Sequence, residues 1–435
     1  MYTLVKGTHD IILKEASKYS YVEGLLQKIA ESFGYKEFRT PIIENTELFA
    51  RSSGESSDIV RKEMYTFMDK GDRSISLRPE GTAGVIRCMV NEKVFINQDY
   101  PVKAFYCGPN FRYERPQKGR FRQFNQFGVE CCGVTSPYRD AETIILGYDS
   151  LMFLGFKNLT LKINSLGDDE TRTNYCNALR EYFKKYVDNM CDDCKERYKT
   201  NVLRILDCKV DEDRKIIENA PKIQDFYSDA TKDSFNKIQE FLKLQNIPFE
   251  IDDTLVRGLD YYSGVVFEYH YTTKSGLNVG AIGAGGHYGK LIPELGGPNI
   301  EGVGFAIGIE RVVSVLEDDN LLDNHDDPLD TYIMPIGENN FSKALEIANY
   351  LRVNGYSSDV CLENKGVGQM FKKAERRDAL YALILGDDEV KNNTINLKNL
   401  TSQEQKNIKL DDLLKTLDHL FGEDDDCDDD CCKHE

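Results

Sequence analysis

Long apolar runs, an apolar N-terminal leader and an excess of positive charge are all missing from this sequence. No apolar run approaches the roughly eighteen residues of a membrane-spanning helix, and Lys6, His9 and Asp10 fall where a signal peptide would be continuously apolar. We therefore expect a cytoplasmic protein with no membrane partner. In the reducing cytosol its 12 cysteines would be free thiols or metal ligands, so no structural disulfide is expected.

Basic residues are outnumbered by acidic ones, 55 to 73, which gives a net charge of −18. This balance argues against a nucleic-acid partner, because neutralisation of phosphates dominates that kind of affinity. The distribution weakens the objection, since residues 423–435 alone carry −7 and leave −11 for the rest. Five basic side chains lie within eleven residues, with Glu114 as the one acid among them: Arg112, Arg115, Lys118, Arg120 and Arg122.

The 435 residues, 40% of them hydrophobic, predict two or three domains. Residues 1–325 are typical of an α+β domain, because helical patterns alternate with short β-branched and aromatic runs. From about 168 to 245 the pattern is helical and highly charged, which indicates a helical insertion. The first domain then resumes, because GVGFAIGIERVVSVLE predicts an apolar strand, a break at Gly308 and a helix.

A second module follows the polar stretch DDNLLDNHDDP at 318–328, which ends in proline and is typical of a linker. Residues 326–420 contain consecutive βαβ patterns, which predict a small α/β domain with mainly parallel strands. Residues 421–435 form an acidic, cysteine-containing tail. We expect this tail to be disordered because it is too polar to build a core.

The segment YCGPNFRYERPQKGRFRQFNQFGVE predicts an antiparallel hairpin with a basic tip, because two strand-like runs flank a loop containing Pro116 and Gly119. Strand alternation puts Arg112 and Glu114 on one face of the first strand. It puts four further residues on one face of the second strand: Phe124, Gln126, Gly128 and Glu130. Coinciding faces would form a platform for a nucleotide and a small zwitterion. The alternative is a solvated hairpin with incidental charges.

FRYERPQKGRFRQFNQFGVE resembles motif 2 of class II aminoacyl-tRNA synthetases in its histidyl form. Three segments resemble the amino-acid loop, the histidine-specific signature and motif 3 of the bacterial type of the histidyl-tRNA synthetase family: RPEGTAGVIR (78–87), LVRGLDYYSGVVFE (255–268) and GVGFAIGIER (302–311). Pro41 stands where motif 1 has its proline. The resemblance covers about residues 1–420. It implies an antiparallel-sheet catalytic domain, a C-terminal anticodon-binding domain and a homodimer built around motif 1.

The resemblance implies a ligase that activates L-histidine with ATP and transfers it to the 3′ end of tRNA(His). The histidine site would comprise Glu80, Gly81, Thr82, Arg112, Gln126, Glu130, Arg257, Tyr261, Tyr262 and Tyr288. Glu80, Thr82 and Gln126 would hold the ammonium group. Glu130 and Tyr262 would meet the two imidazole nitrogens. Core packing is the alternative role for the tyrosine pair.

The ATP site implied by the resemblance would comprise Arg112, Glu114, Arg120, Phe124 and Arg311. Arg112, Arg257 and Arg311 would be catalytic, because two anions approach one another in the reaction and positive charge must be placed there in advance. ATP would be a substrate, with Mg²⁺ as its counterion. In this family an arginine, here Arg257, is thought to stand where other class II enzymes place a magnesium ion.

Contacts with tRNA would divide between the two domains. The loop containing Arg115 and Gln117 would meet the extra 5′ guanosine that marks histidine tRNA, since Gln can read a base edge. The candidate anticodon contacts are Lys365, Lys372, Lys373, Arg376 and Arg377. The alternative for this cluster is a solvated helix face.

The sequence departs from the family where GGRYD is usual and GGHYG is present, so that His287 replaces an arginine and Gly289 an aspartate. This puts the fine structure of the pocket wall in doubt. A CxxC motif and two further thiols suggest zinc, but their loose spacing favours a chain without a metal site: Cys176, Cys191, Cys194 and Cys208.

Three other functions compete with this interpretation. A regulatory subunit of ATP phosphoribosyltransferase shares the fold, but it should lack the C-terminal module and a complete Arg257 signature. A class II synthetase for another amino acid is opposed by RGLDYYSG and Glu130. A tRNA-binding protein without catalysis would not need Arg112, Arg257 and Arg311 together.

Overall fold

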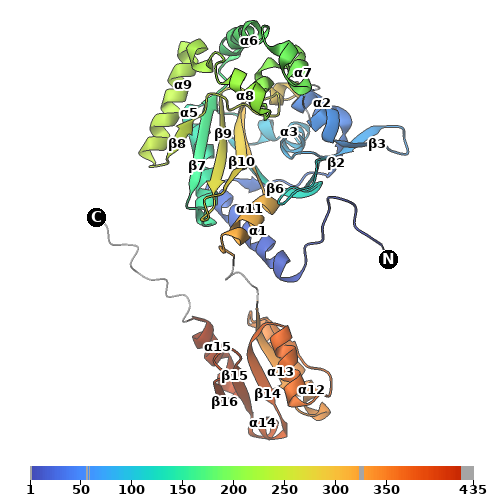
Figure 1. The fold of residues 1–435 in the computed structure, drawn as a ribbon. Coiled ribbons are helices and arrows are strands. Elements are labelled where there is room, and N and C mark those ends of the chain that lie inside the picture. The colour runs from blue at the N-terminus through green and yellow to red at the C-terminus, as the bar shows by residue number, and fades with distance from the viewer. Residues whose placement is uncertain (1, 55–56, 58, 323–327, 423–435) are drawn as a thin grey trace. The chain divides into compact units, whose positions relative to one another are not determined.

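The computed structural model describes residues 2–54, 57, 59–322 and 328–422. The chain divides into two compact units, 1–325 and 326–435, each with its own sheet (Figure 1). Of the predicted linker at 318–328, residues 323–327 lie outside the described residues, as does the acidic tail from 423 onward, whereas Leu322 packs in the core of the first unit. Within the described part, no helix is both long and apolar enough to cross a membrane, and the cysteines are free thiols.

An eight-stranded sheet forms the centre of the first unit. Its strands, in spatial order, are β1 (Lys36–Glu37), β5 (Val102–Phe111), β6 (Gln123–Cys132), β11 (Gly302–Gly308), β10 (Asn278–Tyr288), β9 (Val265–Thr272), β7 (Leu159–Ser165) and β8 (Phe249–Ile251). The outer pairs β1–β5 and β7–β8 are parallel, and the five inner pairs are antiparallel. This confirms the α+β fold class.

Helices cover one face of this sheet and form the main hydrophobic core with it. The helices are α1 (Leu13–Ser32), α5 (Pro137–Phe153), α9 (Asp229–Leu244) and α11 (Ile309–Asp318). In β9, Val265, Phe267 and Tyr269 point into this core, while Val266 belongs to a core on the other side. The alternation leaves Glu268 on that other side.

The opposite face is only partly covered. α3 (Thr82–Asn91), α4 (Val94–Asn97) and α10 (Leu291–Glu294) pack there, next to α2 (Thr46–Ser53) and a small sheet of β2 (Ile43–Asn45), β4 (Ser74–Leu77) and β3 (Tyr65–Met68). Phe127 and Val129 of β6 lie in the main core, whereas Gln126 and Glu130 face a cavity on this side. The predicted alternation along this strand is confirmed.

The segment between β7 and β8 is helical and has its own core. Its core is formed mainly by α6 (Asp169–Phe183), α7 (Asp192–Thr200) and α8 (Asp211–Ile217), whereas α9 packs in the main core. Figure 1 shows α6, α7 and α8 grouped at one end of the sheet. The side chain of Asp168 accepts from Thr171 N at 2.8 Å and begins α6, and Ser228 caps α9 in the same way at 3.1 Å.

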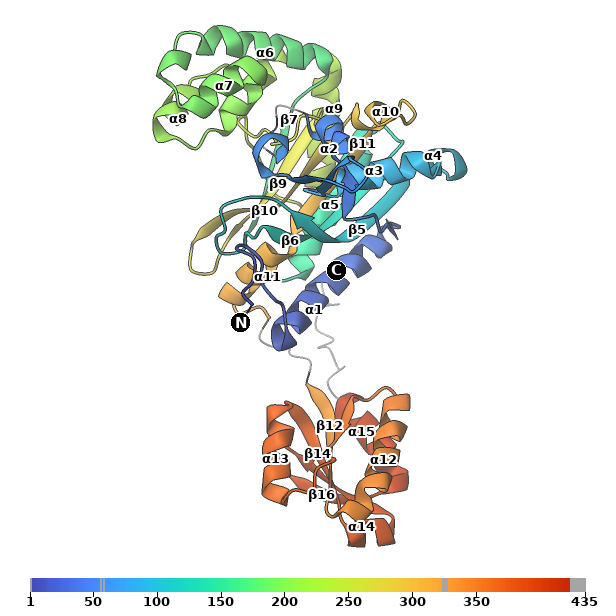
Figure 2. The ribbon, with the colours of Figure 1, turned by 90° about the vertical axis from the view of Figure 1, so that its right-hand side faces the viewer.

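The second unit has a five-stranded sheet in the order β13 (Ser358–Val360), β12 (Leu329–Pro335), β14 (Ala379–Leu385), β15 (Thr394–Asn399) and β16 (Gln405–Lys409). Figure 2 shows α12 (Phe341–Val353) and α13 (Val367–Arg376) on opposite faces of it. The helices α14 (Asp387–Asn392) and α15 (Leu413–Gly422) complete the unit. The first three strands are parallel as predicted, but β15 and β16 form an antiparallel hairpin. The prediction of mainly parallel strands was therefore wrong for this half of the sheet.

The predicted hairpin is present, but its strands are shorter than expected. β5 pairs with β6 as far as Phe111↔Gln123, so Arg112 and Glu114 lie in the connecting loop and not on a strand face. The backbone N–H of Arg112 still donates to Arg122 O at 2.9 Å. Proline and glycine in the loop end the ladder early, and the loop side chains reach the cavity from its rim.

Candidate functional site

A cavity of about 370 Å³ opens on the partly covered face of the large sheet, a size typical of small-molecule sites. Thirteen of the residues singled out in the sequence line it: Glu80, Thr82, Arg112, Glu114, Arg120, Phe124, Gln126, Glu130, Arg257, Tyr261, Tyr262, Tyr288 and Arg311. They come from strands β6 and β10, from the first turns of α3 and α11, and from loops far apart in the chain. Arg115 and Gln117 lie on the exposed loop outside this lining.

A buried carboxylate, that of Glu130, marks the deep end of the cavity. Burial, reinforced by the nearby Glu80, raises the pKa of Glu130 to about 8, although hydrogen bonds from neighbouring hydroxyls oppose the shift. Tyr288 donates to Oε2 at 2.8 Å and Tyr106 donates to Oε1 at 3.1 Å. A Cβ at residue 304 would lie 2.1 Å from Oε2, so only Gly304 leaves room for this carboxylate.

Three tyrosines pack around the same end. The rings of Tyr261 and Tyr262 are 4.6 Å apart, and the rings of Tyr261 and Tyr288 are 5.9 Å apart at 80°. All three belong to a buried cluster and also line the cavity. The two roles considered for the pair are therefore compatible, because the same rings pack in the cluster and border the cavity.

Acceptor atoms gather beside this end. Glu80 accepts from the backbone N–H of Thr82 at 2.6 Å and of Ala83 at 2.9 Å, which holds it at the start of α3. Gln126 accepts from Asn110 at 3.0 Å. Gly81 contributes differently from the prediction, because a Cβ there would lie 2.1 Å from the Tyr106 ring. It permits the packing of Tyr106 and is absent from the residues that line the cavity.

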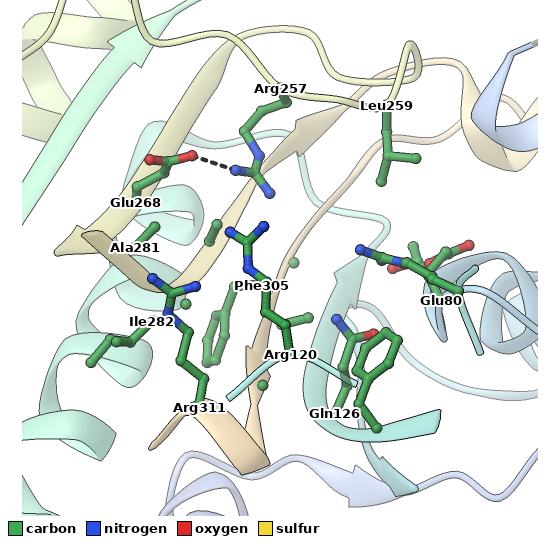
Figure 3. Close-up of a pocket in the computed structure, with 18 of the residues that line it drawn as sticks. Glu80, Arg120, Gln126, Arg257, Leu259, Glu268, Ala281, Ile282, Phe305 and Arg311 are labelled. Carbon is green, nitrogen blue, oxygen red and sulfur yellow. Dashed lines mark hydrogen bonds and ion pairs between the residues drawn. The ribbon is translucent and has the colours of Figure 1, made fainter. Parts of the chain in front are cut away.

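Three arginines also line the cavity, and the guanidinium of Arg257 lies 5.8 Å from the centre of the Tyr262 ring. Figure 3 shows the guanidinium groups of Arg120, Arg257 and Arg311 pointing into one space. Burial and the neighbouring Arg120 lower the pKa of Arg311. Three cations that converge in this way suit an anion of several charges, and Arg groups suit phosphate because of their planar donor fork.

Glu268 positions one of these cations and was not recognised in the sequence. Its Oε1 accepts from Arg257 Nη1 at 2.6 Å, and its Oε2 lies 2.8 Å from His270 Nε2. Burial would raise the pKa of this carboxyl, but His270 and Arg257 lower it below its ordinary value. The available signal was its position at the end of LVRGLDYYSGVVFE, on a strand face that faces the cavity.

The rim of the cavity is formed by the hairpin loop. Arg112 donates from Nε to Pro79 O at 2.8 Å, and its guanidinium lies 5.2 Å from the centre of the Phe124 ring. Glu114 lies between two arginines, 3.8 Å from Arg112 and 3.9 Å from Arg120. The loop therefore brings a flat aromatic face, an acceptor and two cations together, as a purine nucleotide requires.

Glu310, a further carboxylate that the sequence did not single out, lines the same cavity beside Arg311. Both of its oxygens accept from Asn125 N, at 2.8 and 2.9 Å. Burial raises the pKa of Glu310 to about 7. Its signal in the sequence was adjacency to Arg311 in GIER.

Comparison with known proteins identifies the family. The family model described as histidyl-tRNA synthetase matches residues 7–312, and the model described as an anticodon binding domain matches residues 330–420. The chain belongs to the histidyl-tRNA synthetase family. A histidine–tRNA ligase of Bacillus licheniformis is 43% identical over 416 residues, which are 96% of this chain and 98% of that protein.

Solved structures agree with the family assignment. An apo histidyl-tRNA synthetase of Staphylococcus aureus has a TM-score of 0.81 at 37% identity, covering 96% of this chain and 100% of that one. A Bacillus halodurans C chain described as an ATP phosphoribosyltransferase regulatory subunit/histidyl-tRNA synthetase has a TM-score of 0.64 at 20% identity, covering 89% and 98%. The second likeness shows a shared fold alone.

The departure from the family pattern at His287 lies behind the cavity wall. Tyr288 faces the cavity, so its neighbour on β10 faces the other side, where Nδ1 of His287 lies 3.1 Å from Asp140 and Nε2 lies 3.3 Å from Glu301. Burial alone would lower the pKa of His287, but the two carboxylates raise it to about 10. The ring therefore carries a positive charge between the two carboxylates.

The candidate tRNA contacts lie on surfaces. Arg115 and Gln117 are exposed, and their neighbour Lys118 is paired with Asp318 at 2.5 Å. In the second unit the basic cluster lies on and beside α13: Lys365, Lys372, Lys373, Arg376 and Arg377. Glu363 pairs with two of these lysines, so the cluster is partly neutralised within the unit.

Proposed function

We propose that this chain is a histidine–tRNA ligase, which activates L-histidine with ATP and transfers the histidyl group to the 3′ end of tRNA(His). One observation carries the proposal. A cavity in a chain of this family holds the converging guanidinium groups of Arg120, Arg257 and Arg311, together with a buried carboxylate that accepts hydrogen bonds from two tyrosines. The arginines suit a polyphosphate, and the carboxylate with its tyrosines suits an imidazole.

In the activation step, an oxygen of the histidine carboxylate attacks the α-phosphorus of ATP. A mixed carboxylate–phosphate anhydride forms, and the bond to pyrophosphate breaks. Both reactants are anionic, so positive charge arranged beforehand lowers the barrier. Arg257 and Arg112 would bind the α-phosphate and the carboxylate. Arg120 and Arg311 would bind the outer phosphates, with the adenine between Phe124 and Arg311 and its amine donating to Glu114.

Selection of histidine would depend on the deep end of the cavity. Glu130 would accept from one imidazole nitrogen, and the hydroxyl of Tyr262 would hydrogen-bond the other. Glu80, Thr82 and Gln126 provide the acceptors that an ammonium group needs when it leaves water. A cavity that hydrogen-bonds the polar atoms of its substrate rejects analogues lacking them by large factors, so no editing step is required.

Mg²⁺ would enter as the counterion of ATP. It binds through one or two carboxylates together with substrate phosphates, and Glu310 fits this role. Burial raises the pKa of Glu310, although the hydrogen bonds from the backbone and side chain of Asn125 oppose the shift. When bound, the ion would add to the positive charge around the outer phosphates.

The second chemical step, the transfer to tRNA, involves both units. The catalytic domain would be residues 1–325, with the insertion at about 168–245, and residues 326–420 would bind the anticodon. Gln117 and Arg115 would contact the 5′ guanosine at the acceptor end. We further propose a cytoplasmic homodimer built around the segment that contains Pro41, as the family resemblance implies.

The deciding experiment is ATP–pyrophosphate exchange with each amino acid in turn, followed by charging of tRNA(His). We expect exchange with histidine alone. Exchange driven better by another amino acid would overturn the substrate. Histidine binding without any exchange would indicate a regulatory relative, and exchange without charging would contradict the assigned transfer step.

A further inference from the structure

We propose that Cys191, Cys194, Cys208 and Asp213 bind one Zn²⁺ ion that holds the helical insertion together. These four side chains lie in the insertion and line no part of the histidine and ATP cavity. One ligand atom from each lies within 4.8 Å of all the others. Three thiolates and one carboxylate are a donor set that suits a closed, tetrahedral zinc site.

The distances agree with a tetrahedron. Zinc–sulfur bonds of about 2.3 Å place neighbouring sulfurs of a tetrahedral site about 3.8 Å apart. The Sγ atoms of Cys191 and Cys208 are 3.8 Å apart, and Sγ of Cys208 lies 3.3 Å from Oδ2 of Asp213. A disulfide requires sulfurs about 2.05 Å apart, so this spacing fits shared metal coordination better than a bond.

The four candidate ligands are largely buried, and backbone N–H groups donate hydrogen bonds to two of them. Cys194, Cys208 and Asp213 are buried, and Cys191 is partly exposed. The backbone N–H of Val210 donates to Sγ of Cys208 at 3.5 Å, and that of Cys191 donates to Oδ2 of Asp213 at 3.1 Å. Such surrounding donors hold ligands in position.

Asp213 is the most informative member of the set. Its residue is only 2% exposed, and the carboxylate accepts from the backbone N–H of Cys191 and from the thiol of Cys208. Neither donor carries a charge, and burial of an anion without a counter-charge is costly. A divalent cation bound by all four groups supplies that charge.

The chain positions explain what the ion would hold. Cys191 precedes α7 and Cys194 lies in its first turn. Cys208 ends the 3-10 segment Val202–Asp207, and Asp213 lies in the first turn of α8. These are short elements with a small core, so one ion that joins all three compensates for limited hydrophobic burial.

The same elements contact the segment that carries the histidine signature. Nδ2 of Asn201, between α7 and the 3-10 segment, donates to Oδ1 of Asp260 at 2.7 Å. Asp260 directly precedes Tyr261 and Tyr262 in the chain. Loss of the ion would therefore loosen one wall of the histidine pocket as well as the insertion.

Zinc content of the full-length protein, purified under reducing conditions and dialysed against zinc-free buffer, tests the site directly. We expect one zinc per chain by elemental analysis. Cys208→Ser and Asp213→Asn should each lose most of it. Cys176→Ser is the matched control, because Cys176 lies in α6 of the same insertion but outside the cluster, and it should retain zinc.

Thiols near the C-terminus require a second control. Replacing Cys427, Cys431 and Cys432 together by serine should leave the zinc content at one per chain. Zinc that disappears in this triple variant but remains in Cys208→Ser would overturn the proposal. A metal-free wild-type protein, or a Cys191–Cys208 disulfide found by mass spectrometry, would do so too.

Cobalt substitution keeps the proposal testable where a serine variant fails to fold. Co²⁺ bound to the wild-type protein should give the visible absorption bands of tetrahedral cobalt and a thiolate charge-transfer band. Asp213→Cys should retain the metal and strengthen the charge-transfer band, because four thiolates replace three. Octahedral cobalt spectra, or a charge-transfer band unchanged in Asp213→Cys, would exclude this ligand set.

Discussion

Arg257 donates from Nη1 to Oε1 of Glu268 across 2.6 Å, so one edge of its guanidinium is held by a carboxylate. Nε of Arg257 is buried and has no hydrogen-bond partner among the described residues. Figure 3 shows the guanidinium directed toward the space shared with Arg120 and Arg311. Because Glu268 holds the guanidinium on one edge while the group points into that space, Arg257 is arranged for a ligand anion before the anion arrives.

Arg257→Ala should lower the rate of adenylate formation by roughly two to three orders of magnitude, the usual effect of losing one preorganised donor. Histidine binding should change less, because Arg257 acts most strongly when charge develops at the α-phosphate. Pyrophosphate exchange and calorimetric histidine binding measure the two effects. A normal exchange rate in Arg257→Ala would show that the role is wrongly assigned.

Glu268→Gln tests the positioning of that arginine. The amide keeps the shape but removes the charge that fixes the guanidinium, so kcat for exchange should fall roughly 10- to 100-fold, as misplacement of a reacting group does. KM for histidine should change little. Glu250→Gln on the edge strand β8 is an exposed control. A rise in KM with unchanged kcat would instead place Glu268 in histidine binding.

Glu130→Gln should raise the melting temperature at high pH while weakening histidine binding. Because the pKa of Glu130 is raised to about 8, this carboxyl favours the folded state fully below its ordinary pKa of 4.5. That contribution is lost as pH rises through 8. Without histidine, the Gln variant should therefore melt at least ~2 °C higher than wild type at pH 9 and equally at pH 4.5. KM for histidine should rise by roughly 10- to 100-fold, the value of a charged hydrogen bond.

A stability gap between wild type and Glu130→Gln that does not change with pH would contradict this assignment. Thermal unfolding at several pH values measures this gap in melting temperature. The same measurement with histidine present tests binding, because histidine should stabilise wild type alone. A Gln variant that binds histidine normally would show that Glu130 does not face the imidazole.

Strand alternation made much of the cavity predictable from the sequence. Gln126 and Glu130 face the same side of β6 because residues an even number of positions apart on a strand do so. Arg112 was placed on a strand face but lies in a loop, since the local pattern gives strand type more reliably than strand ends. The antiparallel pair β15–β16 was missed because the βαβ pattern before it suggested that parallel pairing continues.

Residues whose roles depend on partners far away in the chain could not be predicted. Glu310 is held by Asn125, 185 residues away in the chain. The role of Glu268 follows only from its ion pair with Arg257, which lies on a separate loop. Asp213 was not recognised as a candidate zinc ligand because only cysteines were considered. The fold, not the spacing, brings this carboxylate to Cys191 and Cys194 and leaves Cys176 outside.

His287→Gln should reveal a buried charge that depends on pH. The pKa of His287 is raised to about 10 by Asp140 and Glu301 against the effect of burial. A raised histidine pKa gives stability that is fully present below about 6.5 and is lost as pH rises through 10. Wild type should exceed His287→Gln by on the order of 2 kcal/mol in urea unfolding at pH 6, and the gap should close near pH 10.5. A constant gap would indicate packing rather than charge.

Gln117→Ala should weaken the transfer of histidine to tRNA, the step that follows adenylate formation. Gln117 lies on the exposed hairpin loop outside the cavity lining, so adenylate formation should be nearly unchanged. Charging of tRNA(His) should weaken by about 1–3 kcal/mol, the value of one base contact. A tRNA without the extra 5′ guanosine completes a double-mutant cycle, in which Gln117→Ala should have no further effect. Collapsed exchange, or an equal loss with both tRNAs, would remove Gln117 from recognition of the acceptor end.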